Sequence, residues 1–163
     1  MASYATKLLL ASLGIACISC SYADLVSDVC ARSRVASSCN KVLRTNPSSI
    51  RARDLSSLGS AAIDSAHGFT KSAQSMASSL SKTSNDPGLK SCIDNFREAI
   101  ANLNECRSSL TKKDKSSLNI KASAAYTNVD TCKEEYNAPA NLKNEIQNVI
   151  DTCSAILALS NML

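Results

Sequence analysis

The stretch from Leu118 to Tyr136 constrains the fold most, because it joins a helical apolar face to a cysteine. Its apolar and small residues recur at steps of three and four, a spacing that places them on one face of a helix. The alanines on that face allow a neighbouring helix to pack closely. The predicted inward residues are Leu118, Ala122, Ala125, Tyr126, Val129 and Cys132. The charged residues after Cys132 predict an exposed end for this helix.

Three more segments repeat apolar residues with the same helical period, over 54–80, 89–110 and 142–163. Their predicted inward faces include Phe69, Met76, Leu80 and Leu163. Short turns rich in Pro, Asn, Asp and Gly separate these segments. Four long amphipathic helices with short connections predict an all-α fold, an up-down-up-down four-helix bundle over 54–163.

A shorter helical region precedes the bundle. Residues 24–34 and 35–44 each have the period of a short helix, and the sequence Thr45-Asn46-Pro47-Ser48 predicts a break after them. Helices this short bury little apolar surface and are marginal alone. A disulfide between Cys30 and Cys39 would join them into an N-terminal helical hairpin over 24–50, which makes the predicted fold disulfide-stapled.

The first 23 residues have the pattern of a secretory signal peptide. Lys7 supplies the positive start, an apolar run follows, and Ser21-Tyr22-Ala23 gives a small-residue exit. Cleavage after Ala23 would leave a mature chain of 24–163 that is secreted into an extracellular, oxidising compartment. The apolar run is too short to span a bilayer comfortably.

The mature chain keeps six cysteines, and disulfides are their expected state in an oxidising compartment. In the predicted topology, Cys92 and Cys132 lie at the same end of two antiparallel neighbouring helices. A bridge between them is geometrically reasonable and would contribute roughly 4 kcal/mol in the chain-entropy model. Cys106 and Cys153 both fall on apolar faces. They are either buried free thiols or a third bridge.

Several classes of function find no support in the sequence. The chain has one histidine, His67, with no metal ligand or nucleophile at a suitable spacing, so we expect no catalytic residue and no metal site. No phosphate-binding loop or cofactor motif is present. A net charge of +4 without a basic cluster argues against nucleic acid, and polar residues interrupt every apolar segment of the mature chain, which argues against a membrane. We therefore predict a binding protein and not an enzyme, with a lipid-carrying bundle as the alternative.

The order of its motifs also makes the mature chain resemble the plant invertase/pectin methylesterase inhibitor family. The two cysteines nine apart are followed by DLSSLGSAAIDSA, DPGLKSCIDNFREAI, KDKSSLNIKASAAYTNVDTCKEEY and a final apolar helix ending in LALSNML. The most specific part is the block from Ser123 to Cys132. The resemblance implies a four-helix bundle with a hairpin extension and the bridges Cys30–Cys39 and Cys92–Cys132. It places Cys153 at the family's fifth, commonly unpaired cysteine, and leaves Cys106 outside the pattern.

The resemblance further implies a function by occlusion. Similar inhibitors lie across the long substrate cleft of pectin methylesterase and block access of the pectin chain, without a cofactor. Their contact surface uses exposed polar residues of the middle helices. Carried onto this sequence, the candidate contact residues are Asp94, Glu98, Asp114, Thr131 and Glu134. Thr131 lies within the Thr-Cys motif itself, whereas an ordinary solvated helix face also explains the four acidic residues.

The family divides by target enzyme. Invertase inhibitors typically carry a Pro-Lys-Phe triplet just before the third bundle helix, and this chain has Asp114-Lys115-Ser116-Ser117-Leu118 there. The resemblance is therefore closer to the pectin methylesterase inhibitors. We expect a secreted inhibitor of a pectin methylesterase in the plant cell wall (the apoplast). The alternatives are an inhibitor of cell-wall or vacuolar acid invertase and a non-inhibitory pollen-type member of the same fold.

Overall fold

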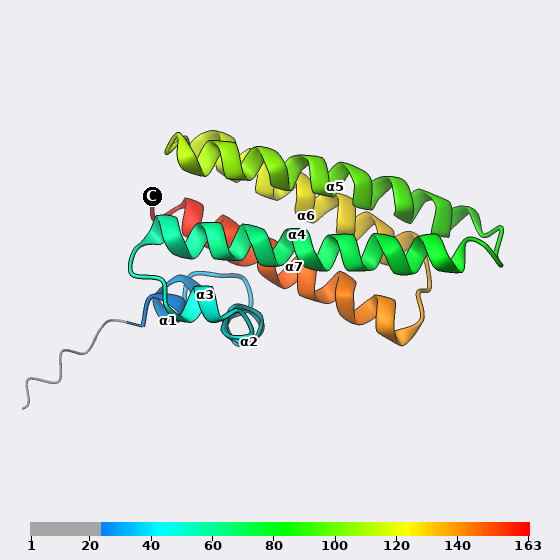
Figure 1. The fold of residues 1–163 in the computed structure, drawn as a ribbon, viewed down its shortest axis with the longest axis horizontal. Coiled ribbons are helices and arrows are strands. Elements are labelled where there is room, and N and C mark those ends of the chain that lie inside the picture. Colours follow the sequence, from blue (N-terminus) through cyan, green and yellow to red (C-terminus); the bar gives the residue numbers. More distant parts are fainter. Residues whose placement is uncertain (1–23) are drawn as a thin grey trace, which may run out of the picture.

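The computed structural model describes residues 24–163, and the predicted signal peptide, residues 1–23, lies outside the described residues. Four long helices form an antiparallel bundle (Figure 1). In that bundle α4 packs against α5 and α7, and α6 packs against the same two helices, so successive helices are neighbours around the core. The bounds are α4 Leu55–Leu80, α5 Pro87–Thr111, α6 Lys115–Glu135 and α7 Ala140–Ser160. The predicted bundle is therefore confirmed.

Three short helices precede the bundle and pack against α7 and α4 near the chain's C-terminal end (Figure 1). Their bounds are α1 Leu25–Cys30, α2 Ala36–Arg44 and α3 Pro47–Ile50. The hairpin is present, but the segment predicted as a simple break contains α3. Pro47 occupies the first turn of this helix, where its missing N–H costs nothing. The Asn46 side chain caps the helix by accepting a hydrogen bond from the Ser48 N–H at 2.8 Å.

The core is aliphatic, as expected for a chain without tryptophan, and Phe96 is its one fully buried aromatic side chain among the described residues. The predicted inward face of α6 is buried except for Tyr126, which is half-buried. In the second half of α4, Ala73 is buried as predicted, but Thr70 and Ala77 are buried as well, while Phe69, Met76 and Leu80 lie half-buried at the margin. Thr70 tolerates burial because its hydroxyl donates to the Ala66 carbonyl at 2.7 Å.

Leu163 was also predicted to face the core, and this was wrong. Helix α7 ends at Ser160, and Leu163 lies beyond it with 40% of its surface exposed. Leu159 is buried instead, at 1% exposure. The helical period therefore identified the correct face and extended it one turn too far.

The pair α5–α6 is closed at both ends. At one end Cys92 is bonded to Cys132, with their Cα atoms 4.6 Å apart. At the other end the chain turns through Lys113, which has a positive φ of 56°. The Lys113 N–H donates to the Leu110 carbonyl at 3.0 Å and the Asp114 N–H donates to the Ser109 carbonyl at 2.9 Å. These two bonds are the Schellman pattern that terminates a helix.

The other four cysteines form one disulfide and two free thiols. Cys30 is bonded to Cys39 within the hairpin. Cys106 and Cys153 are buried free thiols. Burial raises the pKa of the Cys106 thiol to about 12 and also raises the pKa of Cys153. Both thiols therefore stay protonated and packed in the core at neutral pH.

Candidate partner-binding face and its adjoining pocket

The outer face of α5 and α6 carries four of the five predicted contact residues. Its register is fixed by two contacts, Ser91 Oγ with Glu135 Oε2 at 2.6 Å and Lys121 Nζ with Glu105 Oε2 at 2.7 Å. Each helix spans about four turns between these contacts, so α5 and α6 stay in step along the whole face. We call this surface the α5–α6 face.

Thr131 lies in the last turns of α6, one residue before the bridged Cys132, and is half-buried. Its hydroxyl donates to the Thr127 carbonyl at 2.9 Å. The hydroxyl oxygen keeps its acceptor capacity, because a Ser or Thr oxygen has two lone pairs. The disulfide next to Thr131 holds the backbone of α6 against α5. Thr131 is thus a rigidly placed polar residue at the edge between the two helices.

Asp94 and Glu98 lie one turn apart on the exposed side of α5. The Asp94 carboxylate accepts a hydrogen bond from Arg97 at 2.6 Å, in an ion pair whose two side chains are both mostly exposed. Within residues 24–163, the Glu98 carboxylate has no hydrogen-bond or ion-pair partner. Exposed pairs of this kind contribute little to stability, so both carboxylates are available to a partner.

Asp114 directly precedes α6, at the end of the α5–α6 pair that lies opposite the Cys92–Cys132 bridge. It caps α6, because its carboxylate accepts hydrogen bonds from the Ser117 N–H at 3.0 Å and the Ser117 hydroxyl at 2.7 Å. Those bonds hold the pKa of the Asp114 carboxyl below its usual value. Asp94 lies about 25 Å away along the axis of α5, from the helical rise over that length. The structure therefore gives Asp114 a helix-capping role and separates it from the other four candidates.

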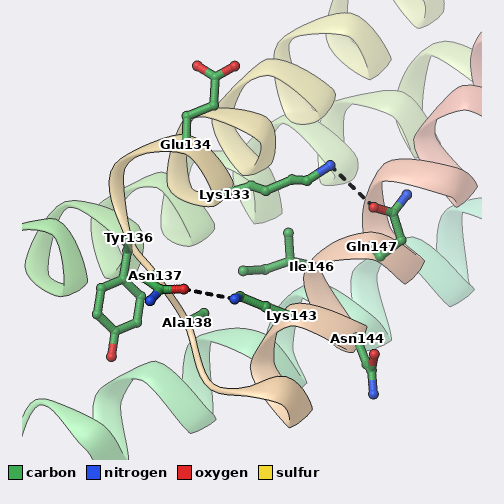
Figure 2. A pocket seen from close by; sticks show the side chains of 9 residues that line it. All are labelled: Lys133, Glu134, Tyr136, Asn137, Ala138, Lys143, Asn144, Ile146 and Gln147. Carbon is green, nitrogen blue, oxygen red and sulfur yellow. Dashed lines mark hydrogen bonds between the residues drawn. The ribbon is translucent and has the colours of Figure 1, made fainter.

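Glu134 lies in the last turn of α6, is exposed, and lines a pocket of about 580 Å³ (Figure 2). The pocket lies where α6 ends and α7 begins. Its other lining residues are Lys133, Tyr136, Asn137, Ala138, Lys143, Asn144, Ile146 and Gln147. This pocket was not predicted from the sequence. The sequence does contain a pattern that could have predicted it. Lys133 and Lys143 lie at equal sequence distances on either side of Ala138, and Ala138 belongs to the turn that joins α6 to α7.

His67 takes no part in a site. Desolvation and the nearby cations Lys71 and Arg107 lower the pKa of His67, so the imidazole is neutral at neutral pH. Residues 24–163 contain no group of His, Cys, Asp and Glu side chains that could hold a metal ion. None of the helices in that part of the chain is long and apolar enough to cross a membrane.

Comparisons with known proteins agree with one another. The profile of the family described as plant invertase/pectin methylesterase inhibitor matches residues 24–159. A pectinesterase inhibitor of Actinidia deliciosa is 33% identical over 147 residues, which cover 85% of this chain and 79% of that protein. Pectinesterase inhibitor 2 of Arabidopsis thaliana is 32% identical over 182 aligned positions, covering 100% of both chains.

Solved structures of pectin methylesterase inhibitors also resemble this chain. The crystal structure of a mutant form of a pectin methylesterase inhibitor from Arabidopsis superposes with a TM-score of 0.76 at 27% identity, covering 85% of this chain and 96% of that one. A second crystal structure, of a pectin methylesterase inhibitor from Arabidopsis thaliana, gives a TM-score of 0.65 at 26% identity, with 86% and 97% covered.

Proposed function

The chain belongs to the plant invertase/pectin methylesterase inhibitor family, and on that premise we propose that it is a secreted inhibitor of a pectin methylesterase. The family consists of inhibitor proteins, so the chain is not an enzyme. The relatives and solved structures compared above are named as inhibitors of pectinesterase or pectin methylesterase. This agreement among the relatives is the observation that favours pectin methylesterase over invertase as the target.

The proposed mechanism is occlusion of the substrate cleft. The α5–α6 face is fixed at both ends by a disulfide and a tight turn. A rigid face loses little conformational freedom on binding, which favours affinity. We propose that this face lies across the cleft of the esterase and blocks the pectin chain, with Thr131, Asp94, Glu98 and Glu134 as contact residues. Asp114 belongs to this contact only if the partner also reaches the far end of the bundle.

Secretion is part of the proposal. Residues 1–23 have the composition of a signal peptide, and two disulfides join residues of the described chain. Disulfides form and persist mainly in oxidising compartments. We propose that the mature inhibitor domain, 24–163, acts in the apoplast. Amino-terminal sequencing of the secreted protein should give Asp24 as the first residue.

The test of the target is a pair of inhibition assays with the mature protein. One follows methanol release from methylated pectin by a plant pectin methylesterase, and the other follows sucrose hydrolysis by an acid invertase. We expect inhibition of the esterase alone. Inhibition of invertase alone would reassign the target, and inhibition of neither enzyme would place the chain among non-inhibitory members of the fold.

A matched pair of variants tests the contact face. Thr131→Trp adds a bulky side chain at the edge between α5 and α6 and should weaken esterase inhibition at least tenfold. Ser79→Trp is the control, because the Ser79 hydroxyl makes the same kind of bond within its helix, to the Ser75 carbonyl at 3.0 Å, but belongs to α4. Equal inhibition by the two variants would exclude the α5–α6 face as the contact.

A further inference from the structure

The pocket between α6 and α7 is lined by two lysines, Lys133 from the end of α6 and Lys143 from the start of α7. Figure 2 shows the side chain of Ile146 between them. Ile146 is 1% exposed, so it closes the bottom of the pocket while both lysines are exposed at its sides. Its volume of about 580 Å³ falls within the range of small-molecule sites.

Both ammonium groups are held by neutral amides. Lys133 Nζ donates to Gln147 Oε1 at 3.3 Å, and Lys143 Nζ donates to Asn137 Oδ1 at 2.8 Å. The Gln147 amide is itself oriented, since its Nε2 donates to Asp151 at 2.9 Å. No ion pair among residues 24–163 involves either lysine. Each ammonium has three donors, so both lysines keep donors available for an anion.

The acidic group nearest to the pocket is turned away from these lysines. Glu134 lines the pocket, but its carboxylate points outward, away from both ammonium groups (Figure 2). Asp151 lies behind Gln147 and is bonded to it. Helix α7, which begins beside the pocket, has no acidic residue in its first turn. The pocket therefore has an apolar floor and positively charged sides, with neutral amide groups beside the two lysines.

We propose that this pocket binds a uronate residue, the carboxylate-bearing sugar unit that remains when an ester group is removed from pectin. A lysine ammonium group would bind the carboxylate, because charge-assisted hydrogen bonds are the stronger kind. The amides of Asn137, Asn144 and Gln147 can both donate and accept, which suits ring hydroxyls. The apolar floor at Ile146 suits the C–H face of a sugar ring.

The choice of a sugar acid over a small inorganic anion comes from the size and the mixed lining of the pocket. A phosphate or sulfate ion could accept hydrogen bonds from the lysines and amides but would leave the apolar floor at Ile146 without a contact. The choice of pectin as the source of the uronate rests on the proposed function, in which the target esterase produces this group. In that case the inhibitor would be retained on pectin that has already been de-esterified.

The test measures binding to the mature inhibitor alone, without any esterase. Backbone amide shifts in a ¹H–¹⁵N NMR spectrum are followed while trigalacturonate is added, and then with its fully methylated ester. We expect saturable shifts at residues 133–147 with trigalacturonate, weakening steeply with salt because exposed charges are screened. The ester should bind about tenfold more weakly, since it lacks the charges that the lysines recognise.

The double variant Lys133→Gln/Lys143→Gln should reduce the affinity for trigalacturonate about tenfold or more. The control Lys71→Gln/Lys112→Gln removes the same charge from exposed lysines outside the pocket and should bind like the unmodified protein. Equal binding by the two double variants, or equal binding of ester and acid, would overturn the proposal. Phosphate that binds as tightly as trigalacturonate would also overturn it, because the pocket would then recognise any anion.

Esterase inhibition is measured in parallel on the same variants. If the pocket variant loses trigalacturonate binding and still inhibits the esterase, the proposal holds and the pocket is separate from the inhibitory contact. If the unmodified protein binds trigalacturonate but inhibits no esterase, the proposed function fails while the uronate site stands. If the unmodified protein inhibits the esterase but does not bind trigalacturonate, the uronate site is rejected and the proposed function stands.

Discussion

At the residue scale, the two free cysteines show how burial decides the chemistry of a side chain. Both sulfur atoms lie in the core with no exposed surface, and the pKa of each thiol is raised. The sequence placed both residues on apolar faces but could not decide between free thiols and a third bridge. Whether the two cysteines pair depends on how their two helices are rotated relative to each other. The apolar period of a single helix carries no information about that rotation.

We therefore predict that neither thiol of the mature chain reacts with iodoacetamide at pH 8 in the folded state. After unfolding in denaturant without a reductant, two alkyl groups should add, one at Cys106 and one at Cys153. Intact-protein mass spectrometry measures both states. Alkylation of the folded protein would contradict the burial, and no alkylation after unfolding would indicate a third disulfide.

Asp114 is a second case at this scale, because its position in the sequence motif suggested partner binding and the structure gives it a helix cap. Hydrogen bonds from Ser117 lower its pKa in the folded protein. A lowered pKa stabilises the fold fully above the unfolded-state value, near 4, and that stabilisation disappears as the pH falls through the folded-state value. Asp54 caps α4 in the same way, and its pKa is lowered by Ser57.

We predict that Asp114→Ala lowers the Tm by about 2–4 °C at pH 6, as expected for loss of an exposed cap in a chain of this size. Asp114→Asn keeps a capping oxygen without the charge and should lower the Tm less. The difference in Tm between the unmodified protein and the Asp114→Asn variant should shrink below pH 3, as measured by thermal circular dichroism. A difference that grows toward low pH would contradict the capping role.

At the element scale, the sequence predicted the four long helices well because each carries a regular apolar face and is bounded by turn residues. The Asp86-Pro87-Gly88 turn is an example, since Asp86 accepts hydrogen bonds from Gly88 and Leu89 and Pro87 opens α5. The sequence did not predict α3, which is a single turn without an apolar period, or the pocket, which two helices and their connection form together. Features built from several elements leave no local pattern in any one of them.

Two glycines in long helices should respond oppositely to substitution by alanine. A methyl group at Gly68 would meet no atom within 4 Å, whereas one at Gly88 would lie 2.6 Å from the backbone oxygen of Glu135. We predict that Gly68→Ala stabilises the protein by about 1 kcal/mol and that Gly88→Ala destabilises it by about 1–3 kcal/mol. Chemical denaturation measures both, and a stabilising Gly88→Ala would show that α5 and α6 do not approach this closely.

At the scale of the whole molecule, the hairpin and the bundle are stabilised by different means. Helices α1–α3 are short and depend on the Cys30–Cys39 bond and on packing against α7 and α4. The four bundle helices supply most of the buried core, to which the hairpin adds a smaller set of residues, Val26, Val29, Cys30, Cys39, Val42 and Leu43. This division was predictable from helix lengths and cysteine positions. The way the hairpin docks was not predictable, because it depends on contacts between separate elements: Asn46 donates to the Ala61 carbonyl of α4, and Arg34 donates to the Tyr126 hydroxyl of α6.

We predict that Cys30→Ala/Cys39→Ala loosens the hairpin and leaves the bundle folded. Most of the helical circular dichroism should remain, while amide hydrogen exchange in 24–50 should become much faster than in 54–163. Loss of all helical signal in this variant would show that the bundle depends on the hairpin. Cys92→Ala/Cys132→Ala provides the comparison, since it removes a bridge within the bundle itself.

The closed α5–α6 pair also determines how far the molecule can be stretched. Its bridge joins residues 40 apart in sequence across a Cα distance of 4.6 Å, so a force applied to the two ends of the chain bypasses the whole loop. Roughly 130–140 Å of contour length is removed from the extended chain while the bridge is intact. A protein pulled in a porous, tensioned polysaccharide network would therefore lengthen only through the chain outside its two disulfide loops. Asp94, Glu98 and Thr131 lie inside the protected loop, whereas Glu134 lies just outside it.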